Sequence, residues 1–182
     1  MASSTDPNDT RKGEIADNDF RAWFQKNLPV WRQPAEKILQ TEPSHVPIMM
    51  IYLDSQRDTP AKVIPLVMDG NNADKSRVAW LQRRLANEEF VWAVIVVWEV
   101  WMTMHEPGDD PAFAYGSRSL EEHPKRQEGI MFNCLHGHQQ LMVVLPIDRA
   151  TKTLGDPGKY GIVDPFTQGN EGRMILNKPT AH

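Results

Sequence analysis

The stretch Phe90–Met104, which reads Phe-Val-Trp-Ala-Val-Ile-Val-Val-Trp-Glu-Val-Trp-Met-Thr-Met, decides the fold. It is rich in β-branched and aromatic residues, and apolar side chains occupy both sets of alternating positions. This pattern is typical of a strand that is covered on both faces. We therefore predict that residues 90–104 form the central strand of a sheet. The stretch is shorter than the roughly 20 residues that a membrane helix needs, and Glu99 interrupts it.

Four shorter apolar segments on either side of this strand predict its neighbours: Ile48–Leu53, Lys62–Met68, Gly129–Leu135 and Gln139–Ile147. The two members of each pair are separated by only a few turn-forming residues, so each pair is expected to be antiparallel. Pro65 places the second segment at a sheet edge or at a bulge. We predict an α+β fold in which a mostly antiparallel sheet of about five strands has helices packed on one face.

Large apolar residues at helical spacing predict a helix near the N-terminus: Phe20, Trp23, Phe24 and Leu28. Pro29 is expected to end this helix, and Pro34 suits the first turn of a second, short one. A further helix after Gly70 is expected to bury Val78, Leu81 and Leu85 and to leave Gln82 on its wetter side.

Length and composition narrow the class of protein. The 182 residues predict one domain, with residues 1–13 as a flexible tail and residues 14–182 as a single α+β domain. A formal net charge of −4 argues against broad binding of duplex nucleic acid. The single cysteine and the absence of an apolar segment near Met1 favour a cytoplasmic protein without internal disulfides, and no membrane partner is expected.

Cys134, His136 and His138 alternate along a predicted strand and would share one face of it. Thiolate and imidazole are ligands that Zn²⁺ prefers, so these residues are candidates for a metal site. With a carboxylate from the 105–127 loop, the set would suit a metal-dependent hydrolase that activates water. In the simpler interpretation, His136-Gly137-His138 is a hairpin turn and Cys134 is a small buried side chain. We expect no cofactor in this case, with Zn²⁺ as the alternative.

Glu99 is a carboxylate inside an apolar strand, where an unpaired charge is costly to bury. It is expected to lie at the exposed end of the strand or to pair with a cation, for which Arg118 and Arg126 are the nearest candidates. We favour a structural ion pair over a catalytic base, because paired buried charges are commonly structural.

The chain holds 6 tryptophans and 9 methionines, which is generous for its length. Trp23, Trp92 and Trp98 are assigned to the core. The other aromatic and basic candidates form a predicted binding set: Trp31, Trp80, Trp101, Arg118 and Arg126. Trp, Met and Arg commonly anchor protein interfaces. The leading hypothesis is a non-enzymatic interaction protein that binds a protein partner or forms a homo-oligomer.

One pair of segments resembles a pattern in uncharacterised small bacterial and phage proteins. The segments are Glu99-Val100-Trp101-Met102 and His123-Pro124-Lys125-Arg126-Gln127-Glu128. The resemblance supports a bacterial or phage origin and implies no catalytic residues. It also implies that Glu99, Arg126 and Glu128 belong to one charged cluster at the ends of the strands.

Overall fold

The computed structural model describes residues 14–43, 45–67, 72–104, 126–157, 161–165 and 174–177. Two helices and seven strands occur in these residues: α1 (Asn18–Thr41), β1 (Ile48–Leu53), β2 (Lys62–Pro65), α2 (Asn72–Ala86), β3 (Val91–Met104), β4 (Gln127–His136), β5 (Gln139–Asp148), β6 (Thr153–Leu154) and β7 (Met174–Asn177). Six strands run in the order β2-β1-β3-β4-β5-β6, and β7 pairs with β3 beyond the end of β1. The predicted tail, residues 1–13, and most of the predicted loop, residues 105–125, lie outside the described residues.

Strand β3 is central, as the sequence predicts. It pairs antiparallel with β1 on one side and with β4 on the other. Its side chains alternate between two apolar layers: Ile95 and Val97 belong to the layer that contains α1, and Val94 and Val96 to the layer that contains α2. All four are almost completely buried. The apolar residues at both alternating positions are therefore explained by cover on both faces of the sheet.

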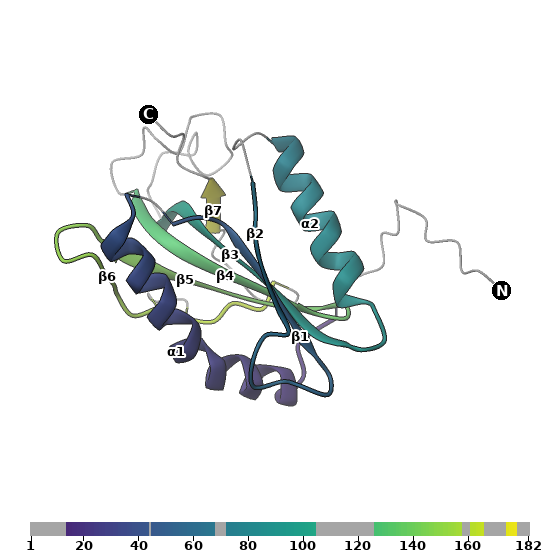
Figure 1. Ribbon diagram of the computed structural model, residues 1–182. Coiled ribbons are helices and arrows are strands. Elements are labelled where there is room, and N and C mark those ends of the chain that lie inside the picture. Colours follow the sequence, from purple (N-terminus) through teal and green to yellow (C-terminus); the bar gives the residue numbers. More distant parts are fainter. Residues whose placement is uncertain are drawn as a thin grey trace.

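Helix α1 is longer than predicted, because it continues through Pro29 and Pro34 to Thr41. The side chain of Asp17 caps its first turn by accepting a hydrogen bond of 2.8 Å from the Phe20 N–H. A proline removes one helical hydrogen bond and favours a bend, and Figure 1 shows that α1 changes direction along its length. The helix nevertheless continues because buried residues recur every three or four positions on both sides of the prolines: Phe20, Trp23, Phe24, Asn27, Trp31, Ala35 and Leu39.

The α+β class and the antiparallel sheet are confirmed, but the two helices pack on opposite faces instead of one. Helix α1 packs on Tyr52, Ile95 and Phe132, whereas the apolar side of α2 packs on the other face (Figure 1). The physical reason is that apolar side chains of β3 point to both faces of the sheet, so a helix must pack on each face to bury them.

Gln82 of α2 is buried, which corrects the prediction that it lies on the wetter side of the helix. Its side-chain amide donates hydrogen bonds to the backbone carbonyls of Val94 on β3 and Asn133 on β4, at 3.0 and 2.8 Å. The Asn133 side chain donates to the Gln82 carbonyl oxygen at 3.2 Å. A polar residue can be buried here because its hydrogen-bonding groups find partners in the sheet.

Candidate functional site

The edge of the sheet at β5 and β6 is covered by other parts of the chain. Glu14 bridges to Gln139 at the start of β5, and Val163 exchanges two backbone hydrogen bonds with Met142, at 2.8 and 2.7 Å. The neighbouring Asp164 is buried and accepts hydrogen bonds from the Ala16 N–H and from the Arg21 guanidinium. Residues near Glu14 and near Val163 therefore pair with part of this edge.

The opposite edge, at β2, has no described strand beyond it, and all four of its residues are exposed. The Leu66 N–H donates to the Pro47 carbonyl at 2.8 Å. Together with the register of the β1–β2 ladder, this hydrogen bond shows which residues of β2 direct their backbone groups toward β1 and which direct them away from it. Lys62 and Ile64 direct their backbone groups toward β1, whereas Val63 and Pro65 direct theirs outward. The outward groups are the N–H and carbonyl of Val63 and the carbonyl of Pro65, because proline has no N–H.

Apart from Lys62, the side chains along this edge are apolar. Val63 is 53% exposed and Val67 is 95% exposed, and Ile64 and Val46 are also open to solvent. The ladder places Val46 opposite Val67, on the same side of the sheet as Val63. We call residues Val46 and 62–67 the β2 edge. A run of β-branched residues like this one usually lies inside a sheet, so its exposure marks a surface that can accept another chain.

A polar cluster lies where Glu99 of β3 meets Arg149, which follows the end of β5, on the α1 side of the sheet. Glu99 is only 6% exposed, and its carboxylate accepts hydrogen bonds from the Arg149 guanidinium and from the His45 backbone N–H. Arg149 also binds the Glu128 carboxylate and the Pro43 carbonyl. Burial acts to lower the pKa of Arg149, but its two carboxylate partners outweigh burial and raise that pKa.

The predicted ion pair of Glu99 is therefore confirmed, with a different partner from the two expected. Arg118 lies outside the described residues, and the Arg126 guanidinium instead lies 4.3 Å from the centre of the Trp101 ring. Arg126 and Glu128 share an open groove of about 580 Å³ with Pro146–Arg149. Arg149 thus bridges Glu99 and Glu128, whereas Arg126 lies over the Trp101 ring. With both oxygens of Glu99 engaged, this arrangement holds strand ends together and does not present a free base.

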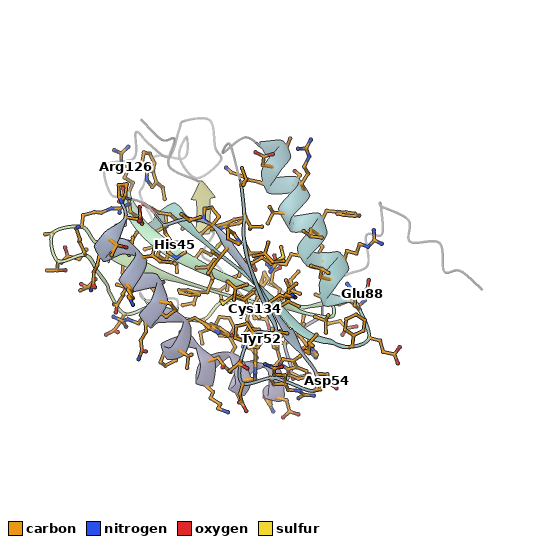
Figure 2. The ribbon with its side chains drawn as sticks, viewed as in Figure 1. His45, Tyr52, Asp54, Glu88, Arg126 and Cys134 are labelled. Carbon is orange, nitrogen blue, oxygen red and sulfur yellow. The ribbon has the colours of Figure 1, made fainter. Side chains whose placement is uncertain are left out.

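His45 and Arg126 lie toward one end of the sheet, whereas Cys134 and Tyr52 lie near its middle (Figure 2). The His45 ring is buried, and neither of its nitrogens has a hydrogen-bond partner among the described residues. Burial lowers the pKa of His45 to about 4, because the charged imidazolium would lose its hydration. His45 is accordingly neutral at physiological pH.

The three predicted metal ligands do not converge. Cys134 and His136 share a face of β4, as their spacing predicts, but His138 lies in the turn beyond the strand. Burial raises the pKa of the Cys134 thiol, which disfavours the thiolate that zinc would need. His136 Nδ1 contacts the Trp92 carbonyl, and the centres of the His136 and Trp92 rings lie 4.1 Å apart with the rings tilted by 39°. Over the described part of the chain, no three His, Cys, Asp or Glu side chains are grouped for a metal.

The predicted tryptophan anchors occupy three different environments. Trp31 is 2% exposed and donates a hydrogen bond of 2.7 Å to the Tyr52 hydroxyl, so it belongs to the core. Trp101 is also buried, beneath Arg126. Trp80 is 49% exposed on α2 and remains available to a partner. The β2 edge was not among the predicted site residues, although Pro65 had indicated an edge strand.

No family model, curated protein or solved structure matches this chain. Among the described residues, neither helix has the length and apolar character that crossing a membrane would require.

Proposed function

We propose that this protein is a non-enzymatic interaction module that binds an extended segment of a protein partner along the β2 edge. The observation that carries the proposal is the exposure of Val63, Ile64 and Val67 along one edge of the sheet, whereas described residues pair with the other edge. Open edges are templates for strand addition.

The geometry of the β2 edge suits a short extended segment. The N–H and carbonyl of Val63 point away from β1 and can form a pair of hydrogen bonds with an added strand. The Pro65 carbonyl supplies one further acceptor. Val63 and Val67 offer apolar contacts to alternate side chains of the incoming strand. Because β2 has only four residues, side-chain contacts must supply much of the affinity.

The contacts of Cys134 and His136 do not favour the alternative of a zinc-dependent hydrolase. Burial keeps the Cys134 thiol protonated, and His136 directs Nδ1 to a backbone carbonyl. We therefore carry forward the interaction function alone.

A selection from a random peptide library, followed by measurement of binding constants, tests the proposal. The selected peptides should bind the wild-type protein and lose at least tenfold in affinity to Val63→Asp and Val67→Asp, since a buried charge opposes strand docking. Val30→Asp is the matched control, because Val30 is an exposed valine on α1, away from the β2 edge. It should bind as the wild type does.

Sedimentation at increasing protein concentration provides the second measurement. Self-association that Val63→Asp abolishes would identify a second copy as the occupant and would replace the partner in our proposal. If no peptide is selected and the protein remains monomeric, or if Val30→Asp weakens binding as much as Val63→Asp does, the proposal is wrong.

A further inference from the structure

The outer face of α2 carries an exposed tryptophan surrounded by arginines. At 3.6 residues per turn, the exposed residues of this helix fall on one arc: Ala73, Ser76, Arg77, Trp80, Arg83 and Arg84. Trp80 lies at the centre of the arc, with Arg77 and Arg84 on one side of it and Arg83 on the other. The opposite side of the helix packs on the sheet through Val78, Leu81 and Leu85.

The charge of α2 contrasts with that of the chain. The helix contains four cations and one acid, for a net charge of +3, whereas the whole chain has a formal charge of −4. Arg83 and Arg84 form no ion pair with any described residue. Arg77 lies 3.5 Å from Asp74, and its own side chain is 82% exposed. The positive charge of this face is therefore largely available to an anionic partner.

The Trp80 side chain adds a second chemical feature to this face. Its ring is half-exposed, and the Arg84 guanidinium lies 5.4 Å from the ring centre. A solvated helix face needs arginines for solubility, but it does not need a large aromatic ring at its centre. Exposed aromatic rings beside cations are typical of surfaces on which the bases of single-stranded nucleic acid stack.

We propose that the outer face of α2 binds single-stranded nucleic acid, with phosphates on Arg77, Arg83 and Arg84 and one base stacked on Trp80. This site is separate from the β2 edge and does not depend on the function proposed there. An acidic peptide would satisfy the arginines but would leave the ring of Trp80 without a planar partner. A nucleotide strand satisfies both features, which is why the observations favour it.

Fluorescence anisotropy with a labelled single-stranded oligothymidylate tests this proposal. Binding should weaken with salt, with a slope of about −2 in a plot of log K against log salt for three phosphate contacts. Trp80→Ala should weaken binding by between about fivefold and 150-fold, the range measured for one stacked base. Trp80→Phe should retain most of the affinity, because a ring remains. Lys26→Ala, an exposed cation on α1, is the control and should change little.

Three results would each overturn the proposal. The first is no binding at low salt. The second is binding that Trp80→Ala leaves unchanged while its circular dichroism matches that of the wild type. The third is equal competition by polyglutamate and by unlabelled oligothymidylate, which would show that the face binds any polyanion.

Discussion

The two edges of the sheet differ in how far other described residues pair with them. At β5, Glu14 and Val163 bridge to the strand, and a buried carboxylate, Asp164, holds the two segments together. At β2, four exposed residues end the sheet, and its valines face solvent. Among the described residues, the chain pairs with one edge and leaves the other one open. The comparison indicates that the closed edge serves stability and the open edge serves binding.

A large effect is expected at the closed edge. Asp164→Ala removes the acceptor for the Ala16 N–H and the Arg21 guanidinium, so we expect the free energy of unfolding to fall by about 3 kcal/mol. Urea denaturation measures the change. Asp58→Ala, which removes a fully exposed ion pair with Lys26, should change stability by less than about 1 kcal/mol. Equal losses in the two variants would show that Asp164 does not hold the closed edge.

A pH-dependent effect is expected beside the open edge, where His45 precedes β1. The folded-state pKa of about 4 lies below the ordinary value of 6.5, so the unfolded chain binds the proton more readily between these values. Stability from this group is complete above pH 6.5 and falls as the pH is lowered, by roughly 3 kcal/mol at pH 4. Urea titrations between pH 6.5 and pH 4 should show that the free energy of unfolding falls less steeply with decreasing pH for His45→Leu than for the wild type. His138→Leu, which removes a histidine from the β4–β5 turn, should decline as the wild type does.

Substitution on the open edge should leave the fold intact. Val67 is 95% exposed, so Val67→Asp should change the free energy of unfolding by no more than about 0.5 kcal/mol. Val143→Asp, at a fully buried position on β5, should in contrast prevent stable folding. Thermal unfolding of the two variants distinguishes the edge from the core. A large loss in Val67→Asp would mean that the β2 edge is part of the core.

The smallest change in stability, with a distinct change in association, is expected from Pro65→Thr. Threonine supplies the outward N–H that proline lacks, so the open edge gains a second hydrogen-bond donor. We expect the free energy of unfolding to change by less than about 0.5 kcal/mol. We also expect the variant to self-associate more strongly than the wild type as the protein concentration is raised. Sedimentation measures the association. An unchanged monomer would indicate that residue 65 does not face outward.

The sequence predicted the strands well because their signals are local. The expected segment Ile48–Leu53 matches β1, and the expected Gln139–Ile147 is one residue shorter than β5. The sequence did not predict that α1 continues through Pro29, because proline has a very low helix propensity. The helix continues because the burial of Trp31 and Leu39 against the sheet stabilises it. Tertiary packing overrides propensity at this position.

The partners of the polar residues could not be predicted from the sequence. Glu99 required a cation, but Arg149 lies 50 residues further along the chain, and only the sheet brings the two together. Trp31 and Trp80 were both predicted as binding residues because the chain is rich in tryptophan, yet Trp31 lies in the core and Trp80 faces solvent. Which face of a helix a residue occupies can be read from spacing, but what covers that face depends on the whole fold.

The buried amide of Gln82 has a consequence for molecular recognition. Because this one side chain holds carbonyl groups on two adjacent strands, rotation of α2 about its own axis would break both bonds. The helix is thereby locked at one angle to the sheet, and Trp80 is held in a fixed orientation before any ligand arrives. A ligand that docks on such a rigid platform loses little of its affinity to ordering the protein.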